Sequence, residues 1–174
     1  MEHARIIILD VDYRTDHAVA AWLIASDWKT DLPIAEGVVR VSDVQDYCPG
    51  SFYKRELPPL REALAQCSQS FDMIMIDGYV WLDEQQIKPG LGAHLYHALD
   101  QRYPIVGVAK NRFKDTRAIE IQRGNSQRPL HVTTAGCDAP IAAQFVQAMH
   151  GPHRIPTLLK RVDRLCRDAK PCIT

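Results

Sequence analysis

Two short apolar runs, each followed by an aspartate, place the strongest constraint on how this chain can fold. Residues 6–9 read Ile-Ile-Ile-Leu and lie shortly before Asp12, and residues 73–76 read Met-Ile-Met-Ile and lie directly before Asp77. Continuous apolar runs of this length are typical of strands buried inside a sheet. A shared core would therefore carry both aspartates toward one edge of that sheet.

Three acidic residues, Asp12, Glu56 and Asp77, are the candidate metal ligands and catalytic residues. Carboxylates gathered at one sheet edge repel one another unless a cation lies among them. Clusters made only of oxygen ligands suit Mg²⁺ or Mn²⁺. We therefore expect these three residues to bind Mg²⁺, with Mn²⁺ as a second option, and to support metal-assisted chemistry on a phosphate ester.

Each of these acids also has a simpler interpretation. Asp12 could end a strand and cap a turn, and Asp77 before Gly78 also suits a turn at a strand end. Glu56 suits the first turn of a helix, where the macrodipole favours an acidic residue. Asp10 shares a strand face with Asp12 because side chains alternate. Both a metal-site role and a solvated position near the turn stay open for Asp10.

Composition limits the classes of protein to which the chain can belong. Its 174 residues and 46% hydrophobic content suit a single domain over residues 1–174. The 21 basic and 21 acidic residues cancel, so a nucleic-acid surface must be a local patch. The five cysteines lack C-x-x-C spacing, which argues against a zinc site or a disulfide framework and favours a reduced cytoplasmic protein. We expect neither a signal peptide nor a membrane span.

The hydrophobic pattern predicts three leading strands, after which helices and strands alternate. Expected strands cover residues 4–13, 18–25, 34–41, 72–77, 104–108, 117–122 and 130–134, and expected helices cover residues 57–67, 91–99, 139–150 and 156–169. This order indicates an α/β protein with a mixed sheet and helices on both faces. The ribonuclease H-like architecture is one such arrangement, and it brings carboxylates from the first strand and a later central strand together.

Short motifs spread along the chain carry a resemblance to a known family. They are Tyr47-Cys48-Pro49-Gly50 with Arg55-Glu56, Ile76-Asp77-Gly78, Gly92-Ala93-His94, Gly107-Val108-Ala109-Lys110 and Arg154-Ile155-Pro156. The first resembles the Y-x-P-G…R-E segment of endonuclease V proteins, and the others are similar to that family's D-G, A-S-H, G-V-A-K and R-I/L-P segments. Their order and spacing agree over nearly the whole chain, which resembles a short, divergent member.

The resemblance implies a fold, a reaction and roles for individual residues. It implies a ribonuclease H-like, Mg²⁺-dependent endonuclease that recognises inosine in DNA or RNA and cuts the second phosphodiester bond on its 3′ side. Asp12 and Asp77 would be the catalytic aspartates of the first and central strands, and Glu56 the third carboxylate. Lys110 would lie near the scissile phosphate, although a plain surface lysine is the alternative.

The resemblance also implies which residues contact the substrate. Tyr47, Cys48 and Pro49 would form a wedge that separates the strands around the lesion, since an aromatic ring stacks on an unpaired base. A core position is the alternative for Tyr47. Residues Gly50, Gly78 and His94 complete the expected substrate contacts. The implied partner is nucleic acid rather than a membrane, and we expect a monomer.

Two segments depart from the family pattern and leave the substrate open. The family continues D-G-x-G-x-x-H-P-R after the central aspartate, whereas Val80 stands here at the second glycine and Asp83 nearest the histidine. Cys137 stands at a second family histidine, and Asp138 is an open candidate to replace it. The chain is therefore either an endonuclease with altered base preference or a nucleic-acid-binding relative that cuts poorly.

Overall fold

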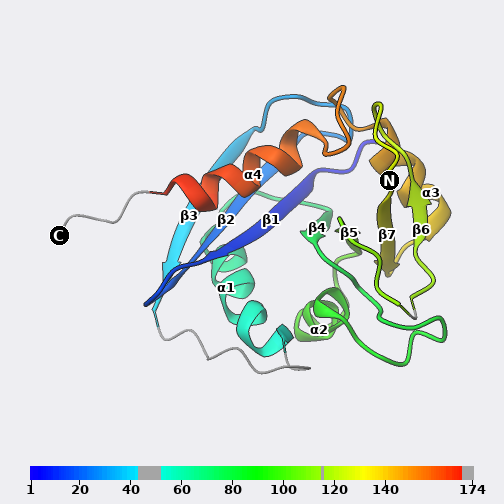
Figure 1. Ribbon diagram of the computed structural model, residues 1–174. Coiled ribbons are helices and arrows are strands. Elements are labelled where there is room, and N and C mark those ends of the chain that lie inside the picture. The colour runs from blue at the N-terminus through cyan, green and yellow to red at the C-terminus, as the bar shows by residue number, and fades with distance from the viewer. Residues whose placement is uncertain (43–51, 115, 170–174) are drawn as a thin grey trace.

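The computed structural model describes residues 1–42, 52–114 and 116–169 (Figure 1). The strands are β1 (Ile6–Tyr13), β2 (Ala18–Ala25), β3 (Ala35–Val41), β4 (Met73–Asp77), β5 (Ile105–Ala109), β6 (Ile119–Ile121) and β7 (Leu130–Ala135). The helices are α1 (Phe52–Gln66), α2 (Leu91–Ala98), α3 (Ala139–Ala148) and α4 (Thr157–Asp168). The order of strands and helices predicted from the sequence is confirmed. In these residues, no helix is long and apolar enough to cross a membrane.

The seven strands of the described residues join one mixed sheet in the order β3-β2-β1-β4-β5-β7-β6. The first three strands pair antiparallel, β4 and β5 run parallel to β1, and β7 runs antiparallel to β5. In Figure 1, α4 lies across one face of the sheet, and α1 and α2 lie on the other. The predicted α/β architecture with helices on both faces is therefore confirmed.

Alternation along β1 divides the apolar residues between two cores. Ile6 and Ile8 are buried in the core beneath α3 and α4, whereas Ile7 and Leu9 are buried in the core beneath α1 and α2. Because β1 lies inside the sheet with helices above and below, both faces of its first half exclude water. The polar residues Asp10 and Asp12 lie in the second half of β1, whose residues are only partly buried.

Helix α1 begins earlier than its hydrophobic spacing predicts and contains two internal prolines, Pro58 and Pro59. Proline at position 59 has no amide hydrogen, so it leaves the carbonyl of Arg55 without its usual helical partner. The hydroxyl of Tyr13 donates to this carbonyl at 3.1 Å, and the Arg55 guanidinium lies 3.9 Å above the Tyr13 ring. The end of β1 is thereby fixed to the turn of α1 that carries Glu56.

Arg123, which follows β6, organises the segment between α3 and α4. Its side chain is 6% exposed, and it donates hydrogen bonds to the carbonyl oxygens of Gln147, Met149, Gly151 and His153. A buried guanidinium satisfied only by carbonyl groups is costly to remove, since each carbonyl would then lack a partner. This residue therefore holds the connection that leads into α4.

Replacing Arg123 with methionine tests this role. We expect Arg123→Met to lower the free energy of unfolding by about 3 kcal/mol, because several buried carbonyl oxygens lose their donors. Denaturant unfolding measures the effect. The exposed Arg128→Met is the matched control, with an expected change within about 0.5 kcal/mol. Equal stability of the two variants would contradict the assignment.

Candidate active site

The register of three adjacent strands brings Asp10, Asp77 and Lys110 together. Leu9 on β1 pairs with Ile76 on β4, and Asp77 pairs with Val108 on β5. Asp10 is thus level with Asp77, and alternation turns Asp10, Asp77 and Lys110 toward the face covered by α4. The Lys110 Nζ lies 2.5 Å from Asp77 Oδ2.

Glu56 reaches this group from α1 on the opposite face. Burial, the negative charge of Asp10 and then that of Asp77 raise the pKa of Glu56 to about 8. Burial and the charge of Asp77 raise the pKa of Asp10 to about 7. Tyr13 lies beside Glu56, and burial together with this negative charge raises the pKa of its phenol. Three acids from β1, α1 and β4 therefore repel one another in a half-buried space.

Lys110 offsets part of this negative charge. Burial opposes its protonation, but the hydrogen bond to Asp77 and the nearby acids raise its pKa overall. Asp163 of α4 lies 3.9 Å from Lys110 Nζ and adds to the negative field at Asp10. The sequence did not single out Asp163, because an acidic residue in an amphipathic surface helix has many structural explanations. Only the packing of α4 over β1 identifies it.

Asp12, the expected first-strand ligand, occupies a different environment. It lies two residues beyond Asp10, or about 7 Å further along the strand, past the end of β4. Its Oδ2 forms an ion pair with Arg14 Nε at 2.5 Å, and Arg14 in turn donates to the carbonyl of Cys166 on α4 at 3.0 Å. The structure thus groups Asp10, rather than Asp12, with Asp77 and Glu56.

The donor chemistry of this group suits a divalent cation. Asp10, Glu56 and Asp77 offer only carboxylate oxygens, and Mg²⁺ or Mn²⁺ would offset the burial and mutual repulsion that raise the pKa values of Asp10 and Glu56. Among the described residues, no three acidic, histidine or cysteine side chains already stand within the reach of one ion.

The structure places only some of the residues that were expected to contact the substrate. Tyr47, Cys48, Pro49 and Gly50 lie outside the described residues. Gly78 follows Asp77 with φ +146°, a conformation that favours glycine, and has open space where a Cβ would lie. His94 stacks on Tyr53 of α1, with ring centroids 3.4 Å apart, and burial lowers its pKa. His94 therefore lies beside the helix that carries Glu56.

Asp83 and Asp138 stand at or near the two positions where the family pattern has a histidine. Each accepts hydrogen bonds from backbone amides of its own segment. The Oδ1 of Asp83 accepts hydrogen bonds from the amides of Ile87 and Lys88 at 2.9 and 3.0 Å. Asp138 caps α3 by accepting from the amide of Ile141 at 2.9 Å. These bonds give each carboxylate a structural role at its position.

Comparison with known proteins gives a consistent family. The family model described as Endonuclease V matches residues 2–144. Endonuclease V of Xanthomonas oryzae pv. oryzae is 34% identical over 104 residues, which make up 59% of this chain and 42% of that protein. Endonuclease V of Xanthomonas campestris pv. campestris is 36% identical over 103 residues, or 59% and 41%. The matched part spans less than half the length of these curated relatives.

Solved structures agree on the fold. The crystal structure of Endonuclease V from Streptomyces avermitilis matches with a TM-score of 0.75 and 24% identity, covering 96% of this chain and 81% of that one. The structure of Ciona intestinalis Endonuclease V in complex with a 24mer DNA, which contains an inosine followed by a ribo-adenosine, matches at 0.77 and 16%, covering 95% and 85%. The predicted ribonuclease H-like fold is confirmed.

Metal binding can be measured without any assay of turnover. Adding Mn²⁺ at about 100 times its Kd should stabilise the protein by about 2.7 kcal/mol, read as a rise in Tm. If Asp10 and Asp77 bind the metal, Asp10→Asn and Asp77→Asn should each abolish this rise. Asp12→Asn and the exposed Asp31→Asn should retain it. A full rise in Asp10→Asn together with its loss in Asp12→Asn would contradict the assignment of Asp10.

The same variants should behave differently when no metal is added. Because the ionised acids repel one another, Asp10→Asn should raise the free energy of unfolding by about 1 kcal/mol in the presence of a chelator. Denaturant unfolding at neutral pH measures this change. A loss of stability would show that Asp10 serves the fold rather than a metal.

Proposed function

The chain belongs to the endonuclease V family, and on that premise we propose that it is a divalent-metal-dependent endonuclease. The reaction is hydrolysis of a phosphodiester bond in nucleic acid that contains inosine or is otherwise distorted. The observation that carries the proposal is the convergence of Asp10, Glu56 and Asp77 beside Lys110. Mutually repelling acids in a half-buried space are costly to the fold, and a cation that they share explains their position.

The proposed roles follow from the position of each residue. Asp10 and Asp77, level on neighbouring strands, would bind Mg²⁺ or Mn²⁺, and Glu56 would complete the ligand set or orient the attacking water. A bound metal ion supplies polarisation of the phosphoryl oxygen and a lowered pKa for water. Lys110 holds a positive charge beside the reacting phosphate and stabilises the charge that develops there. Asp163 is a fourth acid within reach of this group.

Asp12 remains the alternative first-strand ligand that the sequence suggested. Asp12 forms an ion pair with Arg14, whereas Asp10 forms none with another described residue, and burial and the charge of Asp77 raise its pKa. We therefore assign the catalytic role to Asp10 and a positioning role to Asp12. The latter, through Arg14, ties the end of β1 to the C-terminal half of α4.

Inosine is the proposed lesion because of the family to which the chain belongs. Extruding a base costs a few kcal/mol and costs least where pairing is already weak, so a distorted duplex or a single strand is favoured. The Ciona intestinalis relative is known in complex with DNA that contains an inosine. Both DNA and RNA carry the phosphodiester that this site would hydrolyse.

A nucleic-acid-binding protein with weak cleavage is the second candidate, and the segment after Gly78 favours it. The amide of Val80 donates to Thr133 Oγ1 at 2.8 Å, and Trp81 Nε1 donates to the carbonyl of Thr134 at 3.1 Å. Val80 is fully buried at the position where the family has glycine. This packing gives the segment a shape of its own, so base preference and rate both need measurement.

Cleavage of labelled oligonucleotides tests the proposal. With Mg²⁺ or Mn²⁺, the wild type should cut an inosine-containing strand, and Asp10→Asn and Asp77→Asn should each lower the rate by at least about 100-fold. Asp12→Asn should lower it by no more than about tenfold, since its role is positional. The substrates should include inosine, uracil, mismatch and flap oligonucleotides in both DNA and RNA.

Two results would overturn the assignment. If wild type and Asp77→Asn are equally inert on every substrate, the nuclease proposal fails and binding without cleavage stands. If Asp12→Asn is inert while Asp10→Asn is active, the metal ligands have been assigned to the wrong aspartate.

A further inference from the structure

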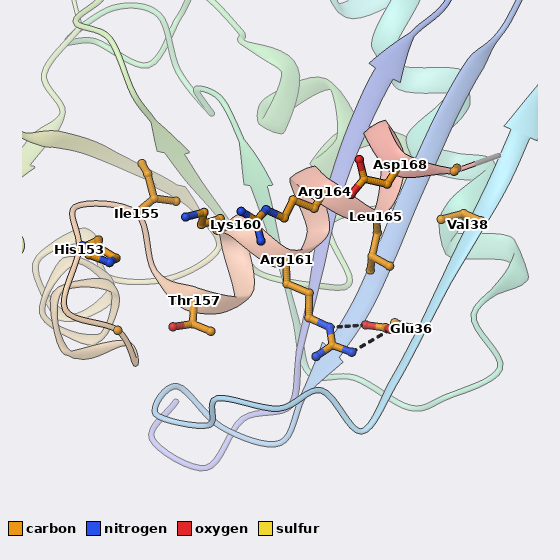
Figure 2. Close-up of a pocket in the computed structure, with 12 residues that line it drawn as sticks. Glu36, Val38, His153, Ile155, Thr157, Lys160, Arg161, Arg164, Leu165 and Asp168 are labelled. Atoms are coloured by element: carbon orange, nitrogen blue, oxygen red, sulfur yellow. Dashed lines mark hydrogen bonds and ion pairs between the residues drawn. The ribbon is translucent and has the colours of Figure 1, made fainter.

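A groove beside α4 lies outside the group of acids and carries positive charge. Its volume is about 670 Å³, and it runs between α4 and the edge strand β3. Lys160, Arg161 and Arg164 of α4 line it, together with His153 and Ile155 of the preceding segment. We call this cavity the α4 groove. Figure 2 shows Lys160 and Arg164 extending from one side of α4, whereas Arg161 turns toward β3.

The charges of the α4 groove are unevenly paired. Glu36 of β3 is held by Arg161 through two contacts of 2.6 and 2.9 Å, so these two charges cancel. Lys160 and Arg164 are exposed, and neither forms an ion pair with another described residue. Asp168 is the other acid that lines the groove. The groove therefore keeps an excess of positive charge, which complements a polyanion.

A second, smaller cavity has lining residues in common with both the α4 groove and the candidate active site. It measures about 240 Å³, and Lys110 and Asp163 line it at the end near the acids. His153, Ile155 and Lys160 line both cavities, so the two share a wall around the N-terminal end of α4. A strand that runs from Lys110 past Lys160 to Arg164 would therefore follow residues that line these two cavities.

Arg154 adds a further cationic group to this path. It lines the smaller cavity, and its guanidinium donates to the carbonyl oxygens of Lys110 and Pro129, which fixes the backbone that carries Lys110. Its positive charge therefore adds to that of Lys110 and Lys160 along this cavity.

We propose that the α4 groove and the smaller cavity bind the phosphate backbone of the nucleic-acid strand on one side of the cut. Lys160 and Arg164 contact successive phosphates, and the apolar side chains of Ile155 and Leu165 lie against the sugars. A sequence-independent contact of this kind positions the strand without reading its bases. The proposal rests on the nuclease function, because the path begins at the acids that would hydrolyse the phosphodiester.

Binding in the presence of a chelator tests the groove separately from cleavage. In about 0.1 M salt, Lys160→Gln/Arg164→Gln should bind an inosine-containing oligonucleotide about tenfold more weakly than the wild type. The slope of log K against log salt should become shallower by about two, one unit for each lost phosphate contact. The matched control is Arg61→Gln/Arg102→Gln, which removes the same charge from exposed residues of α1 and the segment after α2, on the other face of the sheet.

Oligonucleotides shortened on one side of the inosine locate the contact. The affinity of the wild type should fall when the nucleotides on one side of the inosine are removed. It should stay the same when those on the other side are removed. The Lys160→Gln/Arg164→Gln protein should be indifferent to both, because the contact that the flank makes is already absent. The charge-conserving Lys160→Arg/Arg164→Lys should bind like the wild type, which separates loss of charge from damage to the fold.

The outcomes separate the groove from the nuclease proposal. The groove proposal would be overturned if Lys160→Gln/Arg164→Gln kept the wild-type affinity, salt slope and flank dependence. It would also be overturned if the control double variant lost as much affinity. An acidic protein as the true occupant would give the first of these results. If the groove variants lose binding as expected but the wild type cuts nothing, the groove stands and the nuclease function fails.

Discussion

The register between β1, β4 and β5 is the constraint on which the rest of the site depends. Because Leu9, Ile76 and Gly107 are level, the next residues along two of these strands put Asp10 and Asp77 side by side. A shift of one residue would turn every side chain of a strand to the opposite face. The apolar residues of β1 and β4 are buried on both faces, so such a shift would expose the core. The same packing that stabilises the sheet thus holds two carboxylates together.

Elements from both faces of the sheet then complete the site. Tyr13 binds the carbonyl that Pro59 leaves free in α1 and so fixes the helix that carries Glu56. On the other face, Arg123 holds the segment before α4 through backbone carbonyl groups. Arg154, in that same segment, binds the carbonyl of Lys110. The cationic and acidic parts of the site are therefore positioned by arginines and a tyrosine that lie around it.

The positions of the elements were predictable from the sequence, but their contacts were not. Hydrophobic periodicity located the seven strands and four helices of the described part of the chain, because burial on one or two faces leaves a local pattern. The start of α1 at Phe52 was missed, since Pro58 and Pro59 interrupt the usual helical signal. The two aspartates of β1 share a face and are two residues apart, so alternation alone could not choose between them. Nothing in the amphipathic pattern of α4 distinguished Asp163 from an ordinary surface acid.

The sequence by itself determined the fold class and the resemblance to endonuclease V, because hydrophobic periodicity and short motifs are each patterns of residues that are neighbours in the chain. It also suggested an acidic group at one sheet edge, with Asp12 as its first-strand member. Only the tertiary structure decided that Asp10 stands level with Asp77, that Asp12 pairs with Arg14, and that α4 brings Asp163 and a cationic groove to the same place. These are contacts between residues far apart in sequence. Strand register and helix packing set them, and neither leaves a local pattern that a single sequence reveals.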